Sequence, residues 1–260
     1  MTEAVREHTI YPVLFRVGEF EITSFGVLVA VAAVAGVWLF ERERRRSALP
    51  DNTVDAAMAG VFGGMAGAKL VWALEHMGPA EPFLDLLLSR GGLSWFGGFA
   101  GGLLAGLAVV RRRRLPMLRV LAVATPALAL AHAIGRLGCF LVGDDYGLPS
   151  ALPWAMAFPE GLPPTSIAVH PTQLYEMAVL LPVTWLLLRW RHQQRPDWFV
   201  VGAYLVATGS ARFLIEFLRL RESLFGPFAV AHVLSFIAIG VGVVLLGAGR
   251  ARPERPSHSA

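Results

Sequence analysis

The chain alternates between long apolar segments and short polar connections. Seven of the apolar segments are long enough to cross the hydrocarbon core of a bilayer, which takes about 20 helical residues. Their ends are placed to within roughly two to four residues. They lie near Ile22–Phe40, Val54–Leu74, Leu93–Val110, Val120–Phe140, Leu174–Leu188, Phe199–Leu218 and Phe228–Leu246. The pattern predicts an all-α, polytopic membrane protein with seven transmembrane helices.

The composition supports this class of protein. Charged residues make up 16% of the 260 residues, against roughly 25% in soluble domains, and the mean hydropathy is +0.55. The length suits one membrane-embedded domain over residues 1–260. The single cysteine, Cys139, excludes an internal disulfide and a zinc cluster built on cysteines.

Basic residues gather in alternate connections. They follow the first segment, lie between the third and fourth and between the fifth and sixth, and recur in the tail at 247–260. Such connections are cytoplasmic by the positive-inside rule, so we expect the N-terminus outside and the C-terminus in the cytoplasm. The run Arg111–Arg114 fits a topological stop with lipid headgroup contact. It lacks the aromatic or base-reading pattern of a nucleic-acid site, and we expect no nucleic-acid partner.

The polar residues inside the apolar segments fall almost all toward the predicted outer ends. They are Ser24, Lys69, Ser94, Arg136, Cys139, Gln173, Glu176, Arg212, Glu216, Arg219 and His232. A transporter more often places polar groups at the midplane and repeats them in two related halves. The distribution therefore predicts a site that faces the outer leaflet.

Arg136 is the strongest single indication of function. A guanidinium group at bilayer depth is costly and is retained mainly for function. Arg136 shares a helical face with His132 and Cys139, which lie four residues before it and three residues after it.

Arg212, Glu216 and Arg219 repeat this spacing, so Glu216 can pair with either arginine while one guanidinium stays free. Two interpretations are open for them: buried ion pairs that only join helices, or a site for an anion. Ion pairing explains Arg136 less well, because no carboxylate lies on its own helix. Arginine suits bidentate phosphate binding, and converging arginines in the outer leaflet indicate a phospholipid headgroup site.

Glycines are dense in the second segment and around the start of the third. We interpret Gly101 and Gly102 as helix packing, because small residues at spacing four let transmembrane backbones approach closely. The run Gly91–Gly98 is denser than packing needs. We expect it to form a loop whose backbone N–H groups meet an anion at a helix start.

The connection from Leu141 to Thr172 is long and rich in proline, glycine and aromatic residues. Connections of this length are usually functional lids or disordered. Its apolar residues favour a lid or re-entrant loop at about 141–173. Asp144 and Asp145 are weak evidence for a metal ion; we interpret them as a solvated turn and expect no metal.

Five motifs follow one another along the chain. They read Gly-Gly-Leu-Ser-Trp-Phe-Gly-Gly (91–98), Gly-Arg-Leu-Gly-Cys-Phe-Leu-Val-Gly (135–143), Pro-Trp-Ala-Met-Ala-Phe-Pro (153–159), His-Pro-Thr-Gln-Leu-Tyr-Glu (170–176) and Arg-Phe-Leu-Ile-Glu-Phe-Leu-Arg (212–219). Together they resemble the prolipoprotein diacylglyceryl transferase family. The order of the motifs and the seven-segment topology match too, so the resemblance covers nearly the whole chain.

The resemblance implies a multi-pass enzyme of the bacterial cytoplasmic (inner) membrane that needs no cofactor. Such an enzyme moves the diacylglyceryl group of phosphatidylglycerol to the lipobox cysteine thiol in the signal peptide of a preprolipoprotein, and glycerol phosphate leaves. This is the first step of bacterial lipoprotein maturation. The reaction needs a thiolate and stabilisation of the charge that develops on the leaving phosphate.

The resemblance also assigns residues. It places Arg136 and Arg212 at the leaving phosphate with Glu216 as their partner carboxylate, and we add His170 as a catalytic residue because it lies where a thiol would arrive. The residues expected to bind substrate are Lys69, Ser94, Gly97, Gly98, Gly135, Cys139, Gly143, Asp144, Tyr146, Gly147, Gln173, Glu176 and Arg219.

Several positions depart from the family's pattern. Phe96 stands where better-known members have a histidine proposed as the base, and Cys139 stands where they have asparagine. The other departures are Phe25 and Thr208 for tyrosine, Lys69 and Leu148 for arginine, and Asp144 for glutamate. The phosphate-binding part is therefore kept while the proton-handling part differs.

Three replacements for the base are candidates: His170, Glu176 and His132. Each is also explained as a hydrogen-bonded structural group, and the thiol can also arrive already deprotonated. A second hypothesis is a catalytically silent or retargeted paralogue that binds anionic phospholipid or lipoprotein precursors. A third is a transferase for a different lipid or acceptor. Retention of Arg136 and Arg212 favours the enzyme.

Overall fold

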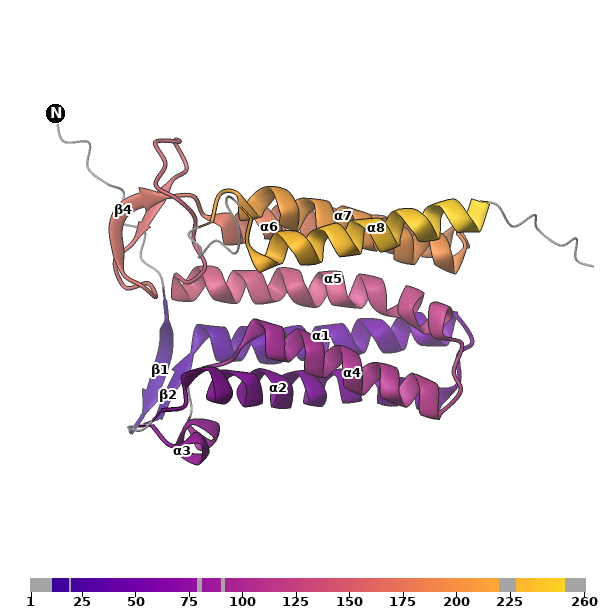
Figure 1. The fold of residues 1–260 in the computed structure, drawn as a ribbon, viewed down its shortest axis with the longest axis horizontal. Coiled ribbons are helices and arrows are strands. Elements are labelled where there is room, and N and C mark those ends of the chain that lie inside the picture. The colour runs from indigo at the N-terminus through magenta and orange to yellow at the C-terminus, as the bar shows by residue number, and fades with distance from the viewer. Residues whose placement is uncertain (1–10, 19, 79–80, 90–91, 220–227, 251–260) are drawn as a thin grey trace, which may run out of the picture. The chain divides into compact units, whose positions relative to one another are not determined.

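The computed structural model describes residues 11–18, 20–78, 81–89, 92–219 and 228–250. Seven long helices dominate this part of the chain (Figure 1), and each overlaps one of the apolar segments of the sequence. They are α1 Ser24–Arg46, α2 Val54–His76, α4 Trp95–Arg112, α5 Met117–Val142, α6 Thr172–His192, α7 Asp197–Glu216 and α8 Val230–Arg250. Two short helices, η1 Asp51–Thr53 and α3 Phe83–Leu88, lie in connections.

Most of the long helices are suited to a bilayer. By length and composition, five stretches of the described residues can cross a membrane: Ser24–Arg46, Asp51–His76, Met117–Val142, Asp197–Glu216 and Val230–Gly249. Helices α4 and α6 are less apolar, because α4 is rich in glycine and ends in two arginines, and α6 contains Glu176 and a basic last turn. The chain is a polytopic membrane protein, as its hydropathy predicts. The basic tail beyond residue 250 lies outside the described residues.

Two antiparallel hairpins accompany the helices. They are β1 Val13–Val17 with β2 Phe20–Thr23, and β3 Met156–Phe158 with β4 Thr165–Val169. Ile22, expected to open the first helix, is therefore in a strand, and α1 begins at Ser24. The long connection expected to be a lid contains regular structure. Strands of three to five residues are too short for alternation of apolar and polar residues to reveal them.

The chain forms two compact units, Met1–Gly36 with Thr125–Ala260, and Val37–Ala124. In the latter, α2 and α4 lie side by side (Figure 1). Their contact includes a row of facing glycines, which we call the glycine seam: Gly60, Gly63, Gly64 and Gly67 of α2 with Gly97, Gly98, Gly101 and Gly102 of α4. A Cβ on Gly97 would overlap the carbonyl oxygen of Gly67. The interpretation of Gly101 and Gly102 as packing residues is confirmed.

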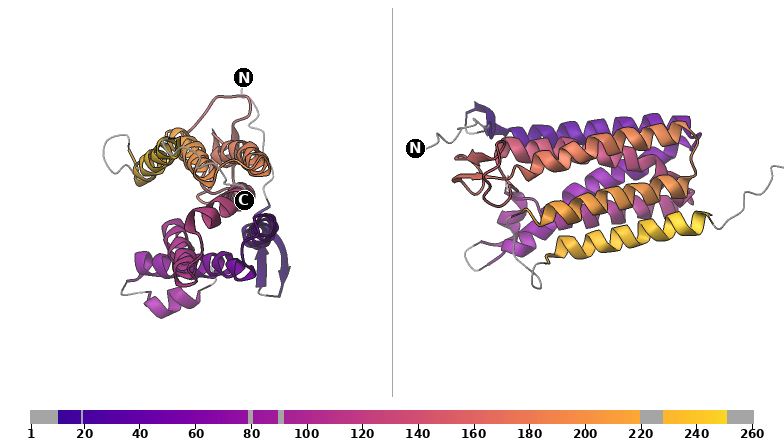
Figure 2. Two further views of the ribbon diagram at one scale, coloured as in Figure 1. Left: turned by 90° about the vertical axis from the view of Figure 1, so that its right-hand side faces the viewer. Right: turned by 90° about the horizontal axis from the view of Figure 1, so that it is seen from above.

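The other unit contains α6, α7 and α8, with α7 and α8 side by side (Figure 2). Glycines again permit close approach, since a Cβ on Gly202 of α7 would meet the carbonyl oxygen of Gly242 on α8. Beside the β3–β4 hairpin, Tyr146, Phe158 and Val169 form a small buried core. This core supports the segment that follows α5.

Backbone hydrogen bonds join that segment to the neighbouring helix ends. The N–H of Leu148 donates to the carbonyl of Leu218, just beyond α7, at 2.7 Å. The N–H of Gly147 donates to the carbonyl of His170, just before α6, at 2.8 Å. The end of α5, the start of α6 and the end of α7 therefore meet around one turn, which positions the site.

Candidate functional site

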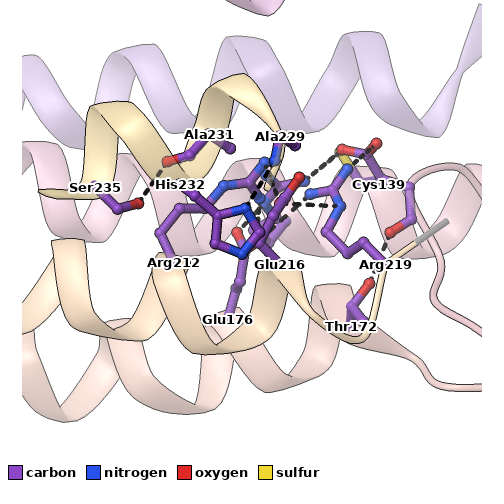
Figure 3. Close-up of polar contacts among 12 residues, drawn as sticks. Cys139, Thr172, Glu176, Arg212, Glu216, Arg219, Ala229, Ala231, His232 and Ser235 are labelled. Atoms are coloured by element: carbon purple, nitrogen blue, oxygen red, sulfur yellow. Dashed lines mark hydrogen bonds and ion pairs between the residues drawn. The ribbon is translucent and has the colours of Figure 1, made fainter. Parts of the chain in front are cut away.

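Six charged side chains meet at this end of α5, α6 and α7, and we call them the ion-pair cluster. They are Arg136 near the end of α5, Asp145 in the turn after α5, Glu176 near the start of α6, Arg212 and Glu216 in the last turns of α7, and Arg219 just beyond α7. Figure 3 shows Glu176, Arg212, Glu216 and Arg219 directed toward one another.

Glu176 lies at the centre of the cluster, and its side chain is 4% exposed. Its Oε1 accepts a hydrogen bond from Nη1 of Arg212 at 2.6 Å and lies 3.6 Å from Nη1 of Arg219. Its Oε2 pairs with Nε of Arg136 and lies 3.5 Å from Nε2 of His132. The sequence predicts Glu176 as a substrate-binding residue and as one of three candidate bases. In the structure it is the shared counter-ion of three arginines.

Glu216 pairs along α7 as its spacing predicts. Its Oε2 lies 3.0 Å from Nη2 of Arg212, four residues earlier, and 3.7 Å from Nε of Arg219, three residues later. The expectation that one guanidinium stays free is wrong, because Arg212 also pairs with Glu176 and Arg219 also pairs with Asp145. Carboxylates from outside α7 could not be assigned to these arginines from spacing along one helix.

Asp145 joins two arginines from the turn that follows α5. Its Oδ2 accepts a hydrogen bond from Nη1 of Arg136 at 2.8 Å, and its Oδ1 pairs with Nη2 of Arg219. Arg136 therefore has carboxylate partners, which come from other elements than its own helix. Although burial favours the neutral acid, the guanidinium groups of Arg219 and Arg136 hold the pKa of the Asp145 carboxyl below its usual range. The side chain of Asp145 is 43% exposed, as expected for a solvated turn, but both of its oxygens pair with arginines.

Two side chains at the start of α6 hold the backbone of this turn. The hydroxyl of Thr172 donates to the carbonyl of Asp145 at 2.7 Å (Figure 3), and Nε2 of Gln173 donates to the carbonyl of Asp144. Both side chains are buried. Gln173, expected to bind substrate, instead positions the turn here.

The residues of the family signature around this turn shape its backbone. Gly143 has φ +71°, a left-handed conformation that favours glycine at the end of a helix. A Cβ on Gly147 would overlap the carbonyl oxygen of Leu218. Tyr146 is buried, and its hydroxyl donates to the carbonyl of Pro163 at 2.7 Å. These contacts explain three expected site residues as parts of the turn's framework.

Cys139 and Asp144 border the cluster. Sγ of Cys139 lies 3.8 Å from Nη1 of Arg136. Burial, followed by the charge of Asp145, raises the pKa of Asp144 to about 6. Donor atoms of Cys139, Asp144 and Asp145 lie within 4.8 Å of one another. Asp145 is already paired with Arg136 and Arg219, and these guanidinium groups make a further cation unfavourable at this position.

His170 lies just before α6 in a short hydrogen-bonded chain. Its Nδ1 is 3.1 Å from the hydroxyl of Tyr175, and that hydroxyl accepts a hydrogen bond from Nε1 of Trp154 at 2.7 Å. The N–H of His170 donates to the carbonyl of Leu148 at 3.0 Å. The hydrogen bond to Tyr175 orients the imidazole, and the backbone hydrogen bond to Leu148 fixes the position of the residue.

Three other expected substrate-binding residues have different surroundings. Gly135 lies in α5, with open space around an added Cβ. Ser94 and Lys69 belong to the unit Val37–Ala124. The hydroxyl of Ser94 donates to Oε1 of Glu75 at 3.3 Å, and Nζ of Lys69 donates to the hydroxyl of Ser89 at 2.9 Å.

α4 begins at Trp95, so residues 95–98 form the expected helix start and are not part of a loop. Anion binding at this helix start stays a prediction. Gly97 and Gly98 lie in the first turn of α4 and pack against α2 in the glycine seam. Gly91 lies outside the described residues. Close backbone approach between two helices accounts for this density of glycine. Phe96, at the position where the resemblance implies a histidine, is 46% exposed.

Sequence reasoning did not assign Asp145 or Thr172 to the site. Asp145 stands beside Asp144, and choosing between adjacent acids requires the backbone conformation, which is left-handed at Asp145 with φ +60°. Thr172 precedes Gln173 in a motif that was recognised. The missing information was the position of the turn over the start of α6.

Known proteins resemble this chain over most of its length. The model of the prolipoprotein diacylglyceryl transferase family matches residues 12–248. Similar proteins named phosphatidylglycerol–prolipoprotein diacylglyceryl transferase occur in Thermosynechococcus vestitus, 32% identical over 86% of this chain and 87% of the relative, and in Methylobacillus flagellatus, 34% identical over 90% and 95%. The relative from Geobacter sulfurreducens is 30% identical over 91% and 94%. The chain therefore belongs to the prolipoprotein diacylglyceryl transferase family.

Proposed function

We propose that this protein transfers the diacylglyceryl group of phosphatidylglycerol to the lipobox cysteine thiol of a preprolipoprotein and releases glycerol phosphate. The names of its relatives support this reaction. The structural observation that carries the proposal is the ion-pair cluster. Three arginines converge there, where α5 and α7 end and α6 begins, and arginine is suited to phosphate recognition. A silent paralogue is not favoured, since the relatives are named as the transferase.

Arg212 is the arginine that first meets the lipid phosphate in this proposal. Its side chain is 25% exposed, against 7% for Arg136 and 9% for Arg219. Glu176 and Glu216 fix the position of Arg212 from two sides. A guanidinium held in this way stabilises developing charge with little reorganisation.

The reaction is a displacement at carbon. The thiol sulfur attacks the glyceryl carbon that is bonded to the phosphate oxygen, the carbon–oxygen bond breaks, and its electron pair stays with the phosphate. Arg212 and its neighbours stabilise the negative charge on the leaving group. The attacking species is the thiolate, so the thiol proton must leave before or during the attack.

His170 is the proposed acceptor of that proton. In the tautomer whose Nδ1–H donates to the oxygen of Tyr175, Nε2 of the imidazole is an acceptor. Trp154 donates to the same oxygen, which leaves a lone pair for the histidine. His170 thus replaces the histidine that is absent at Phe96.

The site is proposed to face the outer leaflet of the bacterial cytoplasmic membrane. One membrane-embedded domain would cross it seven times, with the N-terminus outside and the C-terminus in the cytoplasm. Within the unit that holds the site, the cluster lies at one end of α6 and α7. Arg189 and Arg191 lie in the last turn of α6, at the opposite end, and this placement agrees with the positive-inside rule.

Complementation tests the proposed function. A bacterial strain depleted of its own diacylglyceryl transferase is supplied with the wild type, with Arg136→Ala, or with Arg189→Ala as a control on the exposed basic end of α6. We expect growth with the wild type and with Arg189→Ala, and none with Arg136→Ala. Absence of growth with a wild type that is present in the membrane contradicts the proposed reaction.

A further inference from the structure

Asp145 contacts its arginines in the way that a lipid phosphate would. Its two carboxylate oxygens pair with different arginines: Oδ2 with Arg136 and Oδ1 with Arg219. Two oxygens of one anion bridging two guanidinium groups is also the arrangement that a phosphodiester makes with paired arginines.

Asp145 differs from the other two carboxylates of the cluster. The side chains of Glu176 and Glu216 project from helices and are 4% and 5% exposed, whereas that of Asp145 is 43% exposed. Asp145 also stands in a turn with φ +60°, a conformation that residues other than glycine adopt uncommonly. Of the three, it is the carboxylate that solvent reaches and that can leave its arginines without moving a helix.

Charge balance gives a reason for such movement. The cluster contains three guanidinium groups and three carboxylates, so its own charges balance. Asp144 next to it adds negative charge when ionised. A phosphodiester carries one negative charge, and it enters a balanced site most easily when one internal carboxylate moves away from the arginines.

We propose that Asp145 is an exchangeable internal anion, which the phosphodiester group of the lipid displaces from Arg136 and Arg219. This inference rests on the proposed function, since it takes the lipid to be an anionic glycerophospholipid. The backbone of the turn stays in place during the exchange, because Thr172 and Gln173 bond to its carbonyls rather than to the aspartate side chain. Only the side chain of Asp145 rotates toward solvent.

The exchange has a consequence for selectivity. A neutral lipid such as diacylglycerol cannot replace a carboxylate on two guanidinium groups, so Asp145 remains in place and neutral lipids are excluded. An anionic phosphodiester displaces the carboxylate and supplies a negative charge to the two guanidinium groups in its place. Asp145 therefore acts as a specificity-determining residue for the headgroup. It also weakens binding of the correct lipid, because the phosphodiester must first displace the Asp145 carboxylate.

Binding to the purified full-length protein in neutral detergent micelles tests the proposal. The probes are dioctanoyl phosphatidylglycerol, inorganic phosphate and dioctanoyl glycerol. Asp145→Asn keeps the shape of the side chain and removes its charge. The control is Asp51→Asn, which removes an aspartate that pairs with Arg44 at 2.9 Å in the other unit.

We expect Asp145→Asn to bind dioctanoyl phosphatidylglycerol about tenfold more tightly than the wild type, which is the scale of one favourable charge change in a partly solvated site. Asp51→Asn should bind as the wild type does. Tighter binding of inorganic phosphate as well assigns the gain to the phosphate group. A gain for phosphatidylglycerol alone assigns it to the whole headgroup with its chains. Either gain supports the exchange.

Unchanged or weaker binding of phosphatidylglycerol by folded Asp145→Asn overturns the proposal and makes Asp145 a structural ion pair. If Asp145→Asn does not fold, Asp145→Gly is the second variant, because glycine accepts the left-handed backbone; the same gain is expected and its absence has the same meaning. The transfer reaction is assayed separately. Wild-type transfer without the binding gain rejects only the exchange, and the binding gain without wild-type transfer rejects only the proposed function.

Discussion

The ion-pair cluster and the glycine seam both bring helices together, and they do so by opposite means. In the seam, α2 and α4 approach because the absence of side chains lets one backbone meet the other. In the cluster, α5, α6 and α7 are joined by long charged side chains with specific partners. The seam depends on shape, whereas the cluster depends on charge pairing between particular side chains.

This difference separates a contact that only packs two helices together from a site that offers groups for chemistry. Glycine packing leaves no group able to recognise a ligand, and it tolerates no added volume. Buried ion pairs contribute little net stability compared with apolar packing, because removing both charges from water is costly. A cluster of six charges is therefore better explained by what it binds than by what it stabilises.

The largest expected effect comes from breaking the centre of the cluster. Glu176→Gln leaves three arginines with one carboxylate fewer, and loss of one partner from a buried ion pair typically costs about 3–5 kcal/mol of unfolding free energy. We expect a lower melting temperature in detergent and a transfer rate reduced by roughly 100-fold or more. The matched control is Glu21→Gln, which removes an exposed carboxylate paired with Arg16 at 2.7 Å; its melting temperature should stay near that of the wild type.

A smaller effect is expected from overfilling the seam. Gly67→Val places side-chain atoms against the backbone of Gly97, and overpacking of this kind typically costs about 1–3 kcal/mol. Gly240→Val, in α8 with open space around its Cβ, should cost much less. Thermal melts of the two variants measure the difference. Equal destabilisation by both would show that close backbone approach is not what the seam provides.

The smallest expected effect is a change in pH dependence at Asp144. Its pKa is raised to about 6 by burial and by Asp145, so the folded state binds this proton more tightly than the unfolded chain does. The contribution to stability is complete below the ordinary aspartate pKa of about 4 and is lost as pH rises through about 6.

Asp144→Asn removes this titration. As pH rises from about 4 to about 7, the wild type should lose roughly 1–2 kcal/mol of unfolding free energy that the variant does not lose. This magnitude is reduced to allow for the partial exposure of the side chain. Unfolding free energies at a series of pH values give the measurement. A difference between the two proteins that does not change with pH would mean that Asp144 titrates normally.

The two regions also differ in how far the sequence predicts them. The seven helices follow from the length of apolar segments, and packing at Gly101 follows from small residues four apart. The pairing of Glu216 with Arg212 and Arg219 follows from helical spacing as well. Each of these depends on residues that are near one another along the chain or on one helix.

The parts that were not predicted depend on residues far apart in sequence. Glu176 serves Arg136 across 40 positions of the chain, and no periodicity within one helix reveals such a pair. Asp145 pairs with two arginines from a turn in which its own backbone is left-handed, and residue type alone does not specify that conformation. The conformation of the run at 91–98 is ambiguous for a related reason, since dense glycine fits both a loop and a helix contact. The facing glycines of α2, which lie far away in sequence, account for Gly97 and Gly98.

The central claim is that the cluster performs the transfer, with Arg212 at the leaving phosphate. The most direct measurement uses purified protein in micelles and follows a labelled diacylglyceryl group from phosphatidylglycerol to a peptide with a lipobox cysteine. We predict that the wild type and Arg189→Gln transfer the label at similar rates, and that folded Arg212→Gln is slower by roughly 100-fold or more. Transfer by folded Arg212→Gln at the wild-type rate would contradict the account.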